Sequence, residues 1–253
     1  LYDRLATLQV TINGQLMLLM LCEELEANGI PIISANTDGL MVKVYEDKEE
    51  DFNRIVDWWQ KTTGMSMDAD GLHCLIARDV NNYIAQFRVK DKKTGKLKLE
   101  DELKGTFNPL MYLNDLQKGY SIPIVSKAVY DYFINHVPVM DTLKAATNIL
   151  DFCMTQNVGK NFHIIQRRVI NNEVVDEVYQ RYVRFYVANN GHVLMKVHNI
   201  SGQKERFAAG TVVQICNSLD DTPIELRNID YGYYYRECMK IIAVSYTHLR
   251  AHE

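Results

Sequence analysis

The feature that most constrains the fold is a pair of apolar, β-branched runs at residues 30–45, separated by Asn-Thr-Asp-Gly at 36–39. Asp and Gly tolerate the positive φ angles of tight hairpin turns, so the segment predicts strand, turn and strand. From residue 40 to 45 apolar residues alternate with their neighbours, which is the period of a half-buried strand. The pattern therefore puts Asp38 at the tip of a rigid β-hairpin.

Asp38 has two interpretations at this point. A carboxylate on a rigid support suits a hard divalent cation, which prefers oxygen ligands. An Asp before Gly in a hairpin also commonly does nothing more than form the turn. The spacing alone leaves both interpretations open.

The hairpin segment resembles the C motif of family B DNA polymerases, a strand–turn–strand of the palm domain that is usually written Asp-Thr-Asp. The resemblance implies that Asp38 is the last Asp of that motif, which binds the two catalytic Mg²⁺ ions together with a second Asp from the A motif. Asn36 replaces the first Asp of the motif, and Gly39 stands where Ser is commoner. Asp38 is therefore the catalytic and metal-binding residue that the resemblance implies.

Residues 72–89 predict a second strand–turn–strand. In the family order, a Lys-rich element ending in Tyr follows the C motif and contacts primer–template DNA near the active site. Tyr83 matches that Tyr, although the usual lysine is absent. The resemblance implies DNA contacts from Arg78, Asn82 and Tyr83, with amide hydrogen bonds in place of charge. The alternative is that Tyr83 is an ordinary strand aromatic.

Residues 88–98 are basic, with Asp91 as the single acid, and they predict a hairpin turning at Thr94-Gly95. Such a hairpin either holds duplex phosphates or is a solvated edge that lysines protect from pairing. Lys104, which Gly105 follows, resembles the Lys of the Lys-Gly pair that closes this palm element in the family. The resemblance implies a contact between Lys104 and DNA near the primer end.

Hydrophobic periodicity predicts the remaining elements. Helices are expected at 1–27, where a broad apolar stripe would support the palm sheet, and at 47–63, 111–118, 126–135, 141–154 and 237–242, with Asp47 and Asp141 as N-caps. Strands are expected at 162–169, 173–178, 182–188 and 192–197, with Asn-Asn-Gly at 189–191 as a hairpin turn. Arg and aromatic residues interleave at 181–186, which suits phosphate or single-strand contact or a cross-strand aromatic ladder.

The expected fold class is α+β, with a polymerase palm antiparallel sheet and packed helices followed by a mixed helical and β thumb. A partial palm domain is expected at 1–106, and the thumb and C-terminal region at 107–243. Residues 244–253 resemble a translated sequencing adapter, so we expect a non-native tail and leave it out of the fold prediction. The uncapped helix pattern at residue 1 suggests a gene fragment lacking its N-terminal part.

Composition limits the possible partners and compartment. The chain lacks a run of about twenty apolar residues, so no membrane span is expected. Its five cysteines are scattered without paired spacing, which favours a reducing cytoplasm over disulfides or zinc. A net charge of -4 excludes binding to DNA by bulk charge, so any nucleic-acid contact must rest on local patches.

The order of the motifs resembles the C-terminal palm and thumb of a family B DNA polymerase of the bacteriophage type. The resemblance implies template-directed nucleotidyl transfer with Mg²⁺ in DNA replication, in the cytoplasm of a bacterial host. Its partners would be primer–template DNA and deoxynucleoside triphosphates, the latter bound mainly by parts that precede residue 1. One carboxylate cannot hold two ions, so the fragment alone is expected to be inactive.

Two alternatives remain open. One is a non-catalytic DNA-binding module. The other is a different templated polymerase such as a reverse transcriptase, which usually places two adjacent Asp residues in the turn. Gly39 follows Asp38 here, and this counts against the second alternative.

Overall fold

The computed structural model describes residues 3–37, 39–91, 95–109, 122–207, 211–218, 220 and 222–250, with side chains to residue 245. The helices and antiparallel strands of these residues confirm the α+β class. Asp38, Thr94 and the helix expected at 111–118 lie outside the described residues.

The chain divides into two compact units. The first consists of the described residues of 1–73 and 87–100, and the second consists of the described residues of 74–86 and 101–250. The division falls within the sheet β3-β4-β5, formed by Leu72–Asp79, Asn82–Lys90 and Leu97–Leu103. The two strands expected at 72–89 are therefore present, and the palm–thumb boundary near residue 106 stays a prediction.

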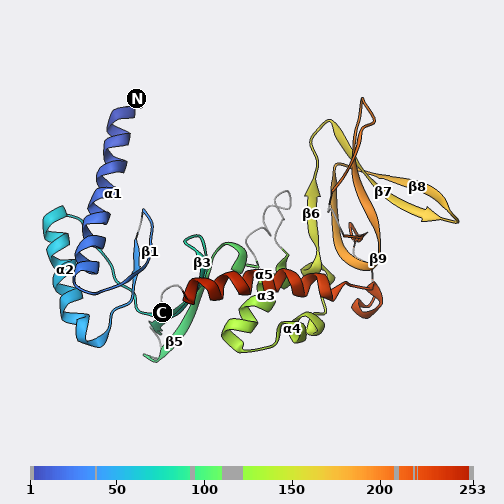
Figure 1. Ribbon diagram of the computed structural model, residues 1–253. Helices are drawn as coiled ribbons and strands as arrows, with labels where there is room; N and C mark the ends of the chain where they lie inside the picture. Colours follow the sequence, from blue (N-terminus) through green and yellow to red (C-terminus); the bar gives the residue numbers. More distant parts are fainter. Residues whose placement is uncertain are drawn as a thin grey trace. The chain divides into compact units, whose positions relative to one another are not determined.

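The first unit begins with helix α1 (Arg4–Ala27), drawn in dark blue in Figure 1. The expectation of an uncapped start is wrong, because the Asp3 carboxylate caps the helix by accepting hydrogen bonds from the amides of Leu5 and Ala6 at 2.9 and 3.2 Å. The helix ends at Ala27 with Asn28 as its C-cap, and Gly29 follows with a φ of 77°, a left-handed conformation that glycine adopts without steric cost.

The apolar surface of α1 is mostly exposed. Within the helix only Leu21 and Leu25 are buried, whereas Leu5, Leu8 and Leu16 are more than half exposed. By length and composition α1 is long and apolar enough to cross a membrane, and it is the one such helix among the described residues. The chain has no uninterrupted run of about twenty apolar residues, yet α1 reaches this length and mean hydropathy with its polar residues included. The absence of a membrane partner stays a prediction.

Two elements pack against the buried end of α1. Strands β1 (Ile32–Ala35) and β2 (Leu40–Val42) form the expected antiparallel hairpin. Helix α2 (Glu49–Thr63) follows the short 3₁₀ turn η1 (Glu46–Lys48). The small core that they share consists of Leu21, Leu25, Ile30, Ile55 and Trp59.

Helix α2 differs from the prediction at its start and agrees at its end. Asp47 lies in η1 and does not cap α2, whose N-cap position is Lys48 without a side-chain hydrogen bond. The helix ends at Thr63, and Gly64 follows in the left-handed conformation. The Trp59 indole Nε1 donates a 2.7 Å hydrogen bond to the Met17 carbonyl oxygen and so joins α2 to α1.

Short helical segments build one half of the second unit. They are η2 (Gly105–Phe107), α3 (Pro123–Tyr130), the π-helical η3 (Asp131–Asn135), α4 (Val139–Ala145), η4 (Ile149–Phe152) and η5 (Ile224–Arg227). The single helix expected at 141–154 is wrong, because the Asn148 side chain accepts a hydrogen bond from the Leu150 amide and starts a separate turn. Asp141 consequently lies in the first turn of α4 and is not its N-cap.

Six strands build the other half of the second unit. They are β6 (Met154–Asn157), β7 (Phe162–Ile170), β8 (Glu173–Tyr179), β9 (Tyr182–His198), β10 (Lys204–Arg206) and β11 (Val213–Ile215). The order is β10-β9-β7-β8, and β6 and β11 pair with the first part of β9. The hairpin turn lies at Asn171 and Asn172, which adopt φ angles of 50° and 66° and connect β7 to β8.

The turn expected at 189–191 is wrong, because β9 continues through it as one strand of 17 residues. Asn189 and Gly191 lie against neighbouring segments there. The Asn189 amide donates to the Asn228 carbonyl at 2.8 Å. A Cβ at Gly191 would lie 2.4 Å from the Val213 backbone nitrogen, so only glycine lets the two backbones approach this closely.

Helix α5 (Tyr231–Arg250), red in Figure 1, packs on α3 and α4. The expected helix at 237–242 is therefore too short, and helical backbone continues into the tail that was left out of the fold prediction. The hydroxyl of Tyr234 is fully buried, donating to the Phe152 carbonyl at 2.8 Å and accepting from the Val187 amide at 2.9 Å. This one side chain ties the helices to β9.

Candidate nucleic-acid-binding site

The turn between β1 and β2 is closed by Asn36. Its backbone amide donates to the Gly39 carbonyl at 3.0 Å, and its side-chain Oδ1 accepts from the Gly39 amide at 2.9 Å. The amide that replaces the first Asp of the polymerase motif is thus bound to the turn backbone. Asp38, the predicted catalytic and metal-binding residue, lies outside the described residues.

A Mg²⁺ site needs several oxygen ligands, and two ions need more than one carboxylate. Among the described residues, no group of three or more His, Cys, Asp or Glu side chains could hold a metal ion.

The turn between β3 and β4 is fixed by Asn82, one of the predicted DNA contacts. Its Nδ2 donates to both carboxylate oxygens of Asp79, at 2.8 and 2.9 Å. Its Oδ1 accepts from the Thr106 backbone amide at 2.8 Å. Both ends of the amide are satisfied within the protein, so Asn82 acts here as a brace between the turn and η2.

Tyr83 and Lys104 lie side by side. Tyr83 is 6% exposed, and its hydroxyl donates to Glu102 Oε1 at 3.0 Å. The Lys104 Nζ lies 5.2 Å from the centre of the Tyr83 ring and 3.4 Å from Glu102 Oε1. The Lys104 amide also donates to the Tyr83 carbonyl at 2.9 Å. The structure thus brings together two predicted site residues, with the aromatic ring buried beneath the lysine.

The environment of Lys104 favours its charged form. Hydrogen bonding to Tyr83, with a smaller effect of Glu102, raises the pKa of the Lys104 ammonium above its usual value. The side chain is 53% exposed, so a protonated amine is offered to solvent from a position that Tyr83 and Glu102 restrict. Such a group neutralises a phosphate without reading a base.

The backbone at position 105 can accommodate only glycine. Its φ is +59°, and a Cβ would lie 2.1 Å from Asn82 Oδ1 and 2.6 Å from the Asn81 carbonyl oxygen. Glycine alone allows the chain to turn after Lys104 and to pass this close to the β3–β4 turn. The glycine of the Lys-Gly pair is therefore required for steric reasons.

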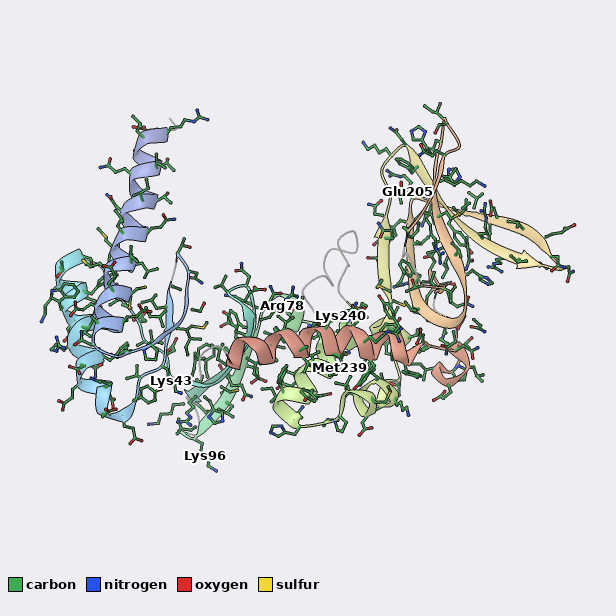
Figure 2. All side chains as sticks on the ribbon, viewed as in Figure 1. Lys43, Arg78, Lys96, Glu205, Met239 and Lys240 are labelled. Atoms are coloured by element: carbon green, nitrogen blue, oxygen red, sulfur yellow. The ribbon has the colours of Figure 1, made fainter. Side chains whose placement is uncertain are left out.

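Arg78, the fourth predicted contact, lines a cleft of about 370 Å³. Thr106, Ser126, Glu237 and Lys240 also line it, together with apolar residues of α3 and α5. Figure 2 labels Arg78 and Lys240 at this place. Thr106 and Lys240 were not predicted, because nothing in their local sequence shows that they line a cleft with Arg78.

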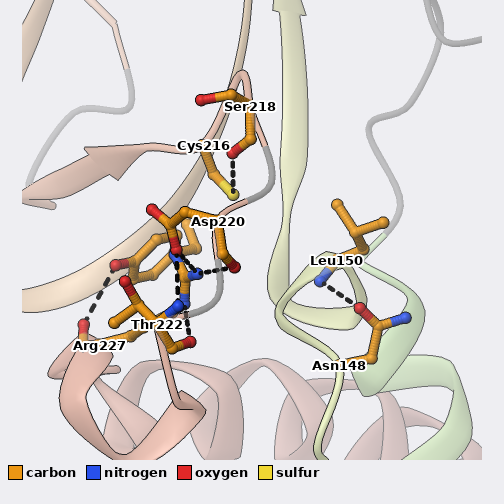
Figure 3. A network of polar contacts seen from close by, with 8 residues as sticks. Asn148, Leu150, Cys216, Ser218, Asp220, Thr222 and Arg227 are labelled. Atoms are coloured by element: carbon orange, nitrogen blue, oxygen red, sulfur yellow. Dashed lines mark hydrogen bonds and ion pairs between the residues drawn. The ribbon is translucent and has the colours of Figure 1, made fainter.

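The interleaved Arg and aromatic residues at the start of β9 serve the fold. Arg184 donates from Nε to the Cys216 carbonyl at 2.8 Å and from Nη2 to the Asn217 carbonyl at 3.1 Å. Beside it, Tyr186 donates from its hydroxyl to the Arg227 carbonyl at 3.2 Å. Figure 3 shows Arg227 in turn bound to Asp220 and to the Thr222 carbonyl. The guanidinium of Arg184 is occupied by backbone and is no candidate phosphate ligand.

Comparisons with family models, with curated proteins and with solved structures find no match to this chain. The polymerase interpretation therefore rests on the motifs of the sequence and on the geometry of the residues that they single out.

Proposed function

We propose that this chain forms the C-terminal palm and thumb of a family B DNA polymerase of the bacteriophage type. The observation that carries the proposal is the cluster of Asn82, Tyr83 and Lys104, which follows a β-hairpin with Asp38 in its turn. The resemblance selects these residues from separate segments, and they lie together around Glu102 and Gly105. A cluster of this kind suits a contact with the phosphates of primer–template DNA.

The reaction of such an enzyme is template-directed nucleotidyl transfer in DNA replication. Asp38 would supply one carboxylate to the Mg²⁺ ions, which stabilise the charge on the transferred phosphoryl group when bound. The remaining ligands and most contacts to the deoxynucleoside triphosphate would come from other segments of the polymerase. This proposal also puts the protein in the cytoplasm of the bacterial host.

Within the cluster each residue has a separate role. Lys104 neutralises a phosphate near the primer end, since its half-exposed ammonium is the positive charge of the cluster. Tyr83 and Glu102 orient that ammonium from below. Asn82 fixes the backbone that carries both residues and does not itself present a free amide.

The test is binding of a fluorescently labelled primer–template duplex to the chain, followed by anisotropy over a range of salt concentrations. Lys104→Gln should lower the affinity and reduce the slope of log K against log salt by about one, as expected for one lost phosphate contact. Lys144→Gln, which removes a charge from an exposed position on α4, is the matched control and should change neither.

An unchanged salt slope in Lys104→Gln would contradict the assigned phosphate contact. The alternative of a non-catalytic DNA-binding module predicts the same binding data. It differs in predicting no Asp-bearing palm strand in the sequence upstream of residue 1, so reading that sequence separates the two.

A further inference from the structure

Thr106 is one of the residues that line the cleft beside the β3–β4 turn, and its side-chain hydroxyl is buried. The Oγ1 atom of Thr106 is buried and has no hydrogen-bond partner in the described part of the chain. The backbone of the same residue is fixed at both ends, since its amide binds Asn82 and its carbonyl accepts from Ser126 Oγ at 2.7 Å. Buried polar atoms are nearly always paired, so this hydroxyl needs an explanation.

Two cations share the cleft with that hydroxyl. Arg78 is held by one long ion pair, in which its Nε lies 3.8 Å from Asp79 Oδ2. Lys240 pairs with Glu237 at 2.6 Å, one turn away on α5. Exposed pairs of this kind contribute little to stability, so both side chains can turn toward a ligand at small cost.

The charges of the cleft sum to +1, from Arg78 and Lys240 against Glu237. A guanidinium, an ammonium and a hydroxyl donor on one concave surface match the oxygen atoms of a phosphate group. Its volume of about 370 Å³ admits a phosphate with part of the group that carries it. Apolar residues of α3 and α5 form the rest of the lining and lower the local dielectric, which strengthens these contacts.

We propose that this cleft is a phosphate-binding subsite in which Arg78 and Lys240 neutralise the anion and the Thr106 hydroxyl donates to it. The phosphate is either a phosphodiester of a nucleic-acid strand or a free anion such as phosphate or pyrophosphate. The first source rests on the proposed function, whereas the second does not. The subsite lies beyond the cluster around Lys104, which does not line the cleft.

The experiment measures two probes on the same variants of the full chain. Inorganic phosphate and pyrophosphate are titrated by calorimetry, and a labelled primer–template duplex is titrated by anisotropy. Arg78→Gln and Lys240→Gln should each weaken binding about five- to tenfold, the effect expected for loss of one charge-assisted contact. Lys144→Gln again serves as the control for the loss of one charge.

Thr106 provides the sharpest variant. Thr106→Val keeps the shape of the side chain and removes a hydroxyl without a partner, so the urea midpoint should stay unchanged or rise. Binding of the phosphate probe should nevertheless weaken, and Thr106→Ser should restore it. A purely structural hydroxyl would give the opposite result, a lower midpoint with unchanged binding.

A substitution of Glu237 should strengthen phosphate binding rather than weaken it. Glu237→Gln raises the charge of the cleft from +1 to +2 and frees Lys240 from its ion pair, so phosphate should bind more tightly. Weaker or unchanged binding in this variant would count against the subsite.

The outcomes distinguish the two sources and the two proposals. If the variants weaken binding of both the free anions and the duplex, the ligand is a backbone phosphodiester. If they weaken binding of the free anions alone, the cleft is a phosphate or pyrophosphate site. If the wild-type chain binds phosphate in the cleft but no duplex, the proposed DNA contact fails and the subsite stands. If Arg78→Gln and Thr106→Val leave the binding of both probes unchanged, the subsite is overturned whether or not the chain binds DNA.

Discussion

The side chain of Asn82 accepts a 2.8 Å hydrogen bond from the backbone amide of Thr106. This bond connects the β3–β4 turn, which carries a predicted DNA contact, to the segment that carries the buried hydroxyl of the cleft. Gly105 lies between Lys104 and Thr106 and makes the close approach possible. The Lys104 cluster and the cleft therefore depend on the same backbone path.

Gly105→Ala tests that path. The substitution adds a Cβ 2.1 Å from Asn82 Oδ1 at a residue whose φ is +59°, so both steric clash and backbone strain oppose it. We expect a loss of about 2–4 kcal/mol in the free energy of unfolding, measured by urea denaturation.

Gly202→Ala is the control for backbone strain. Gly202 has a φ of +68°, but an added Cβ meets no described atom within 4 Å. This variant should lose only about 1 kcal/mol. Equal losses in the two variants would contradict a specific clash at Gly105.

Trp59→Phe tests the packing of α2 on α1. The variant removes the Nε1 donor to the Met17 carbonyl and part of a side chain that is 4% exposed. The free energy of unfolding should fall by about 1–2 kcal/mol. Trp58→Phe, at a neighbouring residue that is 41% exposed, should stay within about 0.5 kcal/mol of wild type. The reverse order of the two effects would show that α2 packs through its other face.

Asp176 gives a pH-dependent prediction. It accepts two 2.8 Å hydrogen bonds from Arg167 and one of 2.8 Å from Lys204, and these partners hold its pKa well below the ordinary value of 3.8. A carboxyl group with a lowered folded pKa stabilises the fold above the unfolded pKa, and this contribution is lost as the pH falls toward the folded value. Stability from Asp176 should therefore be constant at neutral pH and decline below about pH 4.

The variant Asp176→Asn should lower the free energy of unfolding by about 1 kcal/mol at pH 7, since the group is partly exposed and screened by solvent. The difference from wild type should shrink as the pH is lowered below 3.8, measured by urea denaturation at several pH values. Glu173→Gln, at an exposed position on the same strand, is the control. A difference that is constant across the acid range would refute the role assigned to the ion pairs.

Local patterns predicted much of the fold. The hairpin at 30–45, the strands on either side of Asp79 and the end of α2 at Thr63 are all as predicted, because turn chemistry and side-chain periodicity act over a few residues. The hairpin turn expected at 189–191 failed for a non-local reason. Gly191 serves a close approach to Val213, a segment distant in the sequence, and the strand continues through it.

The candidate site was predictable only in part. Asn82, Tyr83 and Lys104 follow from the motif order, but their grouping depends on Glu102 and Gly105, which the sequence does not single out as partners. Thr106 and Lys240 were not predicted. No local sequence pattern shows that a threonine hydroxyl is buried without a partner in the described part of the chain, or that a lysine lines a cleft with a distant arginine. Only the folded structure shows that both residues line the same cleft as Arg78.

The most direct measurement is primer extension by a polymerase polypeptide that carries this sequence at its C-terminal end, comparing Asp38 with Asp38→Asn. Asp47→Asn, at an exposed acid in η1, is the matched control. We predict that Asp38→Asn reduces extension to the level of a metal-free reaction while duplex binding by anisotropy is retained, and that Asp47→Asn extends normally. Normal extension by Asp38→Asn would contradict the account.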